Sequence, residues 1–222
     1  MFEKLSNLPL FQGISKSSLS LLVEKYPFHF LKFKKGDTII TTGEACCHMR
    51  FVISGSVCVS ITSQQSNVTL SQTLEAPEVM VPDYLFGRST TYPCDVTAAT
   101  DCGILQIQKT DYVEMLQSEK ILLYNILNYL SRNSQNRVTY FTSNATGNFV
   151  TRFALMVYEI TRRNSKDICI RFKQKDICQL FGVRRATLIN ALEALSNLGI
   201  VSYSQNEIKV IDRMALVDLI NG

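Results

Sequence analysis

The stretch KQKDICQLFGVRRATLINAL, residues 173–192, contains two short helical patterns separated by a glycine. The glycine, Gly182, stands where a tight turn needs an open backbone, and Val183 is expected to fill the angle between the two helices. The apolar positions follow helical spacing: Ile177, Leu180 and Phe181 before the glycine, and Leu188, Ala191, Leu192 and Leu195 after it. The stretch therefore predicts a helix-turn-helix.

The second helix of this motif is expected to present a polar face at its N-terminus. Arginine can bind guanine or phosphate and asparagine can pair with adenine, so such a face suits the major groove of DNA. Two residues at the start of the first helix are expected to contact phosphates and to fix the register. The predicted DNA-binding residues are Lys173, Gln174, Arg184, Arg185, Thr187 and Asn190.

The flanking sequences predict a complete winged module. An amphipathic helix is expected over residues 149–160 and a short strand over 169–172. Two short strands with a polar turn between them, within 198–211, predict the wing, and a final helix begins at Met214. Basic residues gather before and at the second helix of the motif, which favours DNA over the alternative, a solvated basic face on a protein-binding winged helix.

Residues 28–108 show a different pattern, with short β-rich runs separated by turn formers. Many short strands at regular spacing predict an antiparallel barrel or sandwich. A helix capped by Ser15 is expected before them and ends at Pro27. The predicted turns are Lys35-Gly36-Asp37, Thr42-Gly43-Glu44, Ser54-Gly55-Ser56 and Gln65-Ser66-Asn67.

A helical period returns from Thr110 to about Phe141, which corresponds to a helix about 45 Å long. Such a helix is longer than a small barrel, so its free face is expected to pair with its own copy in a two-fold dimer. The alternative is one helix, or two, packed within the monomer. The predicted interface residues are Leu123, Ile126, Leu127 and Leu130. The polar residues 143–147 predict a hinge.

The composition fits a globular protein of two modest domains, since 46% of the 222 residues are hydrophobic and 19% are charged. The net charge of +4 permits nucleic-acid binding without arguing for it. No apolar run approaches about 20 residues, so no membrane span is expected. The chain does not begin like a signal peptide, so we expect a cytoplasmic protein whose seven cysteines stay reduced.

With a barrel, a long helix and a winged helix in this order, the chain resembles the CRP/FNR family of bacterial transcription regulators over nearly its whole length. The N-terminal motifs that carry the resemblance are Leu10-Phe11-Gln12-Gly13-Ile14-Ser15, Lys35-Gly36-Asp37, Thr42-Gly43-Glu44 and Phe51-Val52-Ile53-Ser54-Gly55-Ser56-Val57. The resemblance implies a regulator, in most of the family an activator, that acts as a homodimer on double-stranded DNA with a two-fold symmetric operator and has RNA polymerase as a further partner.

The resemblance also implies an α+β fold in four parts. These are a cyclic-nucleotide-binding-like β-barrel (double-stranded β-helix or jelly roll) over 1–109, a dimerisation helix over 110–142, a hinge over 143–147, and a winged helix-turn-helix over 148–222. An effector bound in the barrel would control the dimer. The alternative is an effector-independent regulator whose barrel is a structural or protein-docking domain.

The residues that hold cyclic AMP in the family are replaced in this chain. In the family, a Gly-Glu-Leu turn holds the ribose and an Arg-Ser pair holds the cyclic phosphate. Here Pro82 takes the Glu position, and Tyr92-Pro93 replaces the Arg-Ser pair. A buried phosphate needs a cation and free amides, so we expect no cyclic AMP in the usual mode. The predicted effector pocket contains Pro82, Tyr84, Arg88 and Tyr92, with Arg88 as a displaced cation.

The helix-turn-helix also departs from the family pattern Ser-Arg-Glu-Thr-Val, which is followed two residues later by Arg. Arg185 and Thr187 match, but Ala186 replaces the Glu and Asn190 replaces the late Arg. Because glutamate accepts a hydrogen bond from cytosine and alanine cannot, the preferred DNA sequence is expected to differ from the usual half-site.

No catalytic residue, metal site or cofactor is expected. Cys46-Cys47-His48 lacks a second ligand pair at metal-binding spacing, and is interpreted as a loop, with a redox thiol as the alternative. Neither histidine, His29 or His48, lies in a pattern suited to nucleophilic catalysis. The first 45 residues contain no cysteine, which argues against the iron–sulfur branch of the family.

Overall fold

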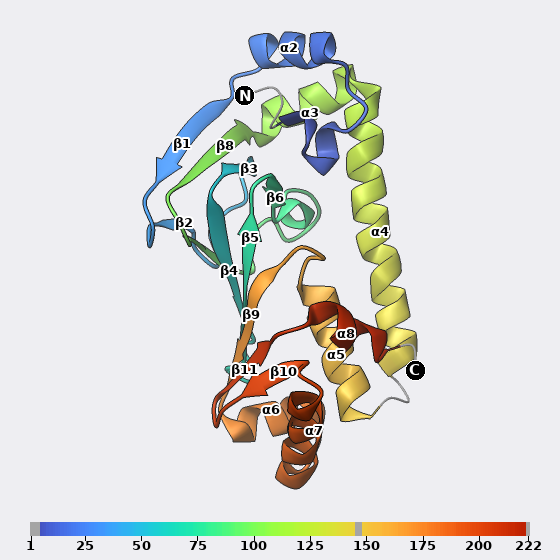
Figure 1. Cartoon of the computed structure of the whole chain (residues 1–222). Coiled ribbons are helices and arrows are strands. Elements are labelled where there is room, and N and C mark those ends of the chain that lie inside the picture. The colour runs from blue at the N-terminus through green and yellow to red at the C-terminus, as the bar shows by residue number, and fades with distance from the viewer. Residues whose placement is uncertain (1–4, 145–147, 221–222) are drawn as a thin grey trace. The chain divides into compact units, whose positions relative to one another are not determined.

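The computed structural model describes residues 5–144 and 148–220, and side chains for all of these except 9, 133 and 136–144. The chain forms two compact units (Figure 1). The first unit comprises Met1–Val59 and Leu74–Ser134, and the second comprises Ser60–Thr73 and Gln135–Gly222. The second unit therefore includes a segment that comes from within the predicted range of the sensor domain, 1–109.

Two antiparallel sheets build the first unit. The first sheet has the order β1 (His29–Phe33), β8 (Cys102–Gln108), β3 (His48–Ser54) and β6 (Glu78–Met80). The second begins with β2 (Thr38–Ile40), β7 (Asp95–Ala98) and β4 (Ser56–Thr62), and it continues through β5 (Thr69–Glu75), most of which belongs to the second unit. The predicted jelly roll is confirmed, although in the described residues the sheets face each other as a sandwich and do not close into a barrel.

Alternation along the strands decides which face of the first sheet is buried. Met49 pairs with Ile107, and Phe51 pairs with Leu105, and all four side chains are buried. Side chains two residues apart on a strand share a face, so these four form one apolar layer. The ring of Phe11 meets Phe51 edge-on at 5.4 Å between centroids and extends this core.

Gly55 is the tightest of the predicted turns. Its φ is +74°, and a Cβ at this position would lie 2.3 Å from the carbonyl oxygen of Asp101. Only glycine satisfies both the positive φ and the close approach, so Gly55 permits the hairpin between β3 and β4 to pack against the chain at Asp101.

The helices of the first unit differ from the prediction at one point. The predicted helix from 110 to 142 is two helices, because Glu119 is extended (φ −122°, ψ 101°). The break has a cause in the sequence. Leu116 and Leu122 are six residues apart, which does not fit a helical stripe, and the charged Glu119 and Lys120 stand where a continuing stripe would need apolar residues. The helices are α2 (Lys16–Lys25), α3 (Lys109–Ser118) and α4 (Lys120–Asn144), with short 3-10 turns at Pro9–Phe11 and Pro82–Tyr84.

Other details of these helices follow the sequence. Ser15 accepts a hydrogen bond from the backbone N–H of Ser18 at 3.1 Å, so the predicted N-cap of α2 is confirmed. Of the predicted hinge, residues 143 and 144 still belong to α4, and 145–147 lie outside the described residues. In the part of the chain that the structure describes, no helix is long and apolar enough to cross a membrane.

The second unit has the predicted winged-helix arrangement (Figure 1). The polar turn of the wing is closed by a hydrogen bond from the N–H of Ser204 to the carbonyl of Glu207 at 2.8 Å. Its elements are α5 (Phe149–Ile160), β9 (Lys166–Arg171), α6 (Gln174–Phe181), α7 (Arg185–Asn197), β10 (Val201–Tyr203), β11 (Glu207–Val210) and α8 (Arg213–Asp218). The three strands have the order β10-β11-β9, and β5 pairs with the free edge of β9.

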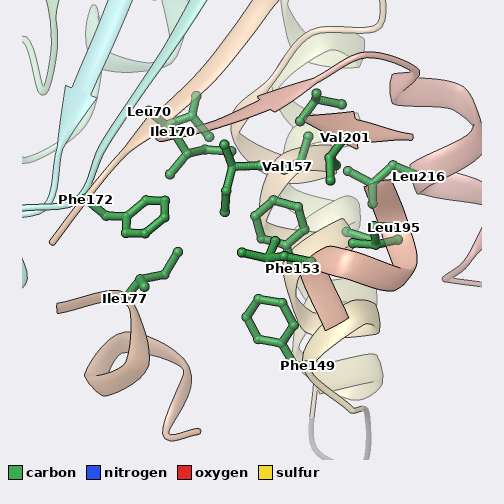
Figure 2. Packing of buried hydrophobic residues seen from close by; sticks show 14 of the residues in the cluster. Leu70, Phe149, Phe153, Val157, Ile170, Phe172, Ile177, Leu195, Val201 and Leu216 are labelled. Atoms are coloured by element: carbon green, nitrogen blue, oxygen red, sulfur yellow. The ribbon is translucent and has the colours of Figure 1, made fainter. Parts of the chain in front are cut away.

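The segment 60–73 contributes to the core of this unit. Leu70 pairs with Ile170 across the β5–β9 edge, and Val68 and Leu70 are buried in the same cluster as Phe153 and Ile170. Figure 2 shows side chains from α5, β9, α6, α7, β10 and α8 converging on this cluster together with Leu70. A hairpin tip from the sensor fold therefore completes the hydrophobic core of the winged helix.

A buried glutamine also attaches this segment. Gln72 is 4% exposed, and its amide donates to the carbonyl of Ile160 at 2.9 Å. Its carbonyl oxygen accepts from the backbone N–H of Arg162 at 3.0 Å and from the hydroxyl of Ser165. Buried polar groups must be hydrogen-bonded, so Gln72 specifies one docking position for β5 on the loop between α5 and β9.

Candidate nucleic-acid interface

The turn of the helix-turn-helix forms as the sequence predicts. Gly182 ends α6 in the left-handed region (φ 59°, ψ 37°), and its N–H donates to the carbonyls of Cys178 and Gln179. The N–H of Val183 donates to the carbonyl of Cys178 at 3.0 Å, and its side chain packs against the core cluster of the second unit. This arrangement fixes where α7 begins.

Gly182→Ala is expected to lower the free energy of unfolding by about 1–2 kcal/mol, because a left-handed conformation strains any residue with a Cβ. No atom lies within 4 Å of that Cβ, so the loss is conformational and not steric. Gly182→Asn should lose less, since asparagine tolerates this conformation. Urea denaturation of the three proteins measures this, and an alanine variant as stable as the parent would contradict the assignment.

Helix α7 separates its polar and apolar residues as predicted. Leu188, Leu192 and Leu195 are buried in the core of the unit. Four predicted DNA-binding side chains, Arg184, Arg185, Thr187 and Asn190, are exposed. The structure therefore brings these four together on the solvent side of the N-terminal half of one helix.

The N-terminus of α7 attracts anions. Arg184 is its N-cap without a side-chain cap, and its first turn contains no acidic residue. In the described part of the chain, neither Arg184 nor Arg185 makes an ion pair. The positive end of the helix dipole therefore lies beside two unpaired cations. Like charges at one place repel each other, and a bound phosphate would remove this repulsion.

Helix α6 carries the remaining predicted contacts. Lys173 is its exposed N-cap residue, and the half-buried Gln174 is its first residue. Leu180 was expected to be buried on this helix but is 44% exposed. The apolar face of α6 is therefore narrower than predicted and is formed by Ile177 and Phe181.

One predicted basic residue is already paired. Arg171 on β9 lies 3.4 Å from a carboxylate oxygen of Glu207 on β11, and Lys209 lies 3.3 Å from the other oxygen. These exposed pairs reduce the net positive charge at the wing. The sequence pattern gave no indication of this pairing, because it depends on the register of the wing.

The predicted effector residues differ in their exposure to solvent. Pro82 is buried, Tyr84 is half-buried, and the displaced cation Arg88 is exposed. Tyr92 is 2% exposed, and its hydroxyl donates to the carbonyl of His48 at 3.3 Å. Burial, followed by a hydrogen bond with Cys46, raises the pKa of Tyr92 far above its usual value, so this hydroxyl stays neutral.

Arg50 is the cation beside Tyr92 that the sequence analysis did not single out. Its guanidinium lies 5.7 Å from the centre of the Tyr92 ring, a cation–π distance. It donates to Gln106 at 3.2 Å and to the carbonyl of Ile39 at 3.4 Å. The sequence did contain a signal for this residue, because Arg50 interrupts an otherwise apolar run within β3.

The predicted dimer residues divide into two groups. Leu123 and Leu127 are 39% and 49% exposed, Leu130 is half-buried, and Tyr124 beside them is exposed. Ile126 is 2% exposed, so it is already buried within the protomer. The free apolar face of α4 therefore contains Leu123, Leu127 and part of Leu130, while Ile126 stabilises the protomer.

The seven cysteines are free thiols that differ in exposure. Cys46 is buried and its neighbour Cys47 is exposed. Burial, with smaller contributions from neighbouring Asp95 and Cys46, raises the pKa of Cys94 to about 11, so this thiol is protonated at neutral pH. Among the described residues, no group of three or more His, Cys, Asp or Glu side chains could hold a metal ion.

Two known protein families match this chain. The family model described as a cyclic nucleotide-binding domain matches residues 30–119, and the one described as a Crp-like helix-turn-helix domain matches residues 151–219. The chain belongs to the CRP/FNR family. It is a DNA-binding transcription regulator of that family, whose members are regulators and not enzymes.

Individual relatives of this CRP/FNR-family chain are distant. The cAMP-activated global transcriptional regulator CRP of Haemophilus influenzae is 22% identical over 178 residues, which are 78% of this chain and 80% of that protein. The catabolite activator protein of Thermus thermophilus has a TM-score of 0.52 at 18% identity, covering 96% of this chain and 99% of that one. The c-di-GMP-responsive global regulator CLP of Xanthomonas campestris has a TM-score of 0.52 at 16% identity, covering 88% and 99%. These two structures support the CRP/FNR fold.

Proposed function

We propose that this CRP/FNR-family regulator is a homodimer that reads an inverted repeat, with one α7 in the major groove of each half-site. The observation that carries the proposal is the exposed N-terminal half of α7, where Arg184 and Arg185 make no ion pair with any described residue and Thr187 and Asn190 lie on the same solvent side. In such dimers the two helices lie one DNA turn apart, about 34 Å.

The proposed role is activation, with RNA polymerase as the partner of the DNA-bound dimer. This part rests on the resemblance to the family, in which activators predominate. Because Ala186 cannot accept a hydrogen bond from cytosine, the operator should differ from the family's usual half-site.

An unidentified effector in the sensor fold is proposed to shift the population of DNA-competent dimers. Cyclic AMP is not the proposed effector. Arg50 already donates to Gln106 and Ile39, and Tyr92 carries no charge, so a cyclic phosphate would find no free buried cation at these residues. The one exposed arginine of the predicted pocket, Arg88, is solvated.

The second candidate is a regulator without an effector, whose sensor fold is a structural or protein-docking domain. The contacts of Tyr92 and Arg50 favour this candidate. The two side chains make a cation–π contact, and the Tyr92 hydroxyl donates to the carbonyl of His48, so both have partners without a ligand. In that case abundance alone would set activity.

Thermal denaturation with ligands distinguishes the effector-controlled regulator from the effector-free one. A ligand that binds only the folded protein stabilises it by about 2.7 kcal/mol at one hundred times its Kd. We expect no saturable rise in Tm with cyclic AMP, and a saturable rise with one member of a metabolite panel. A saturable rise with cyclic AMP would contradict the proposal, and no rise with any metabolite would favour the effector-free candidate.

Leu127→Glu is expected to weaken the homodimer about tenfold or more, because the carboxylate would be buried without a partner at the α4 face. Leu21→Glu is the matched control, since Leu21 is also exposed but lies on α2. Sedimentation over a range of concentrations measures both. A monomeric parent, or equal effects of the two substitutions, would contradict the α4 interface.

A further inference from the structure

A pocket of about 440 Å³ lies within the second unit. Its wall comes from three places in the sequence: the segment 60–73, helix α5 and helix α6. Most of the wall is apolar, with Leu70, Met156 and Phe181 among its residues. The volume and the apolar lining are those of a small-molecule site.

Arg152 is the cation of this pocket. It lies on α5, and its Nε atom is buried without a hydrogen-bond partner among the described residues. Because Nε itself is closed off from solvent, an anion in the pocket would pair with the rest of the guanidinium, whose positive charge lies in a mostly apolar wall. Among the described residues of the wall, none is acidic. A carboxylate is the best match for guanidinium, because it can accept two parallel hydrogen bonds.

Leu180 gives a second reason to expect an occupant. This apolar side chain on α6 is 44% exposed to solvent, and it contributes to the pocket wall. An apolar body in the pocket would remove this side chain from water, together with the exposed parts of Met156 and Ile160. In the described part of the wall, Ser63 is the only polar residue besides Arg152, so this part offers few groups for a ligand rich in hydroxyls or ring nitrogens, such as a nucleotide.

We propose that this pocket binds an organic monocarboxylate with an apolar body. The carboxylate accepts hydrogen bonds from Arg152, and the apolar body lies against Leu70, Met156 and Leu180. The pocket wall contains none of the predicted effector residues, and the proposal goes beyond the proposed function, because it requires neither an effector in the sandwich nor DNA.

Calorimetric titration of the full chain without DNA tests this site. The probes are decanoate, with a linear body, and 2-naphthoate, with an aromatic one; 1-decanol is the uncharged counterpart of decanoate. We expect saturable binding of at least one carboxylate at a ratio of one per chain. 1-Decanol should bind at least about tenfold more weakly, because it lacks the charge-assisted hydrogen bonds.

Three variants assign the binding to the pocket. Arg152→Gln is expected to weaken carboxylate binding about tenfold or more, and Arg152→Lys to recover part of it, since lysine keeps the charge without the planar fork. Arg163→Gln is the matched control, because Arg163 is exposed and lies outside the wall. Met156→Phe should weaken binding by filling space while keeping the charge.

Two results would overturn the proposal. One is the absence of saturable binding for both carboxylates. The other is binding to Arg152→Gln that equals binding to the parent and to Arg163→Gln. Circular dichroism of each variant shows that the fold is retained, and because no DNA is present, the result is independent of the proposed operator.

Discussion

Replacement of Arg185 by alanine is expected to weaken binding to the preferred duplex by about tenfold to a hundredfold, while the fold stays intact. Arg185 is exposed at the first position of α7 and makes no ion pair among the described residues, so the variant loses no contact within the protein. The expected loss is that of one arginine contact to a base edge, about 1–3 kcal/mol. Fluorescence anisotropy at fixed salt measures it.

Two controls separate base reading from charge. Arg132→Ala removes the same charge from an exposed position on α4 and should leave affinity unchanged. Lys173→Ala, at the start of α6, should weaken binding to all duplexes about equally and reduce the salt dependence, as expected for a phosphate contact. If Arg185→Ala weakened all duplexes equally, α7 would contact the backbone and not the bases.

Phe153→Ala is expected to lower the free energy of unfolding of the second unit by about 3–5 kcal/mol, the loss typical of a large aromatic side chain removed from a core. Phe153 is fully buried, stacks on Phe149 at 5.7 Å between ring centres, and lies 6.3 Å from Phe181 of α6. Since α6 and α7 both pack on this cluster, DNA binding should be lost with the fold.

Ile211→Ala is the matched control for Phe153→Ala, because Ile211 belongs to the same unit and is mostly exposed. It should change the free energy of unfolding by less than about 0.5 kcal/mol. Urea denaturation followed by circular dichroism compares the two. Equal losses would show that the cluster around Phe153 is not the core that stabilises the helix-turn-helix.

Local sequence patterns predicted the helix-turn-helix well because its signals lie close together. Gly182, Val183 and the buried leucines of α7 are all within 14 residues, and each is used as the spacing indicates. The exposure of Arg184 and Arg185 followed from the same helical period. The confirmed cap at Ser15 has the same local origin.

Long-range contacts explain what the sequence did not predict. The sequence predicts an ordinary strand at Val68-Thr69-Leu70. Nothing in these residues indicates that Leu70 pairs with Ile170, one hundred residues later. The exposure of Leu180 and the pairing of Glu207 with Arg171 also depend on which segments meet. The helix break at Glu119 could have been predicted, because Leu116 and Leu122 are six residues apart and do not continue one helical stripe.

In the predicted effector region, too, the sequence did not show which residues contact one another. The sequence led us to predict that Tyr92-Pro93 takes the place of the family's Arg-Ser pair, but it did not indicate the partner of Tyr92. Arg50 lies on β3, 42 residues earlier, and reaches Tyr92 only through the fold of the sandwich. Which residues face one another across a jelly roll follows from strand register, which short strands specify weakly in sequence.

Selection of bound duplexes from a randomised library by the purified protein, at physiological salt, tests the central claim most directly. The selection is run without ligand and again with small metabolites extracted from cells. We predict enrichment of an inverted repeat in at least one arm, with half-sites about 10 base pairs apart from centre to centre, and its loss in Arg185→Ala. Failure of both arms to enrich any sequence, or enrichment that Arg185→Ala leaves unchanged, would contradict the account of a dimer that reads DNA through α7.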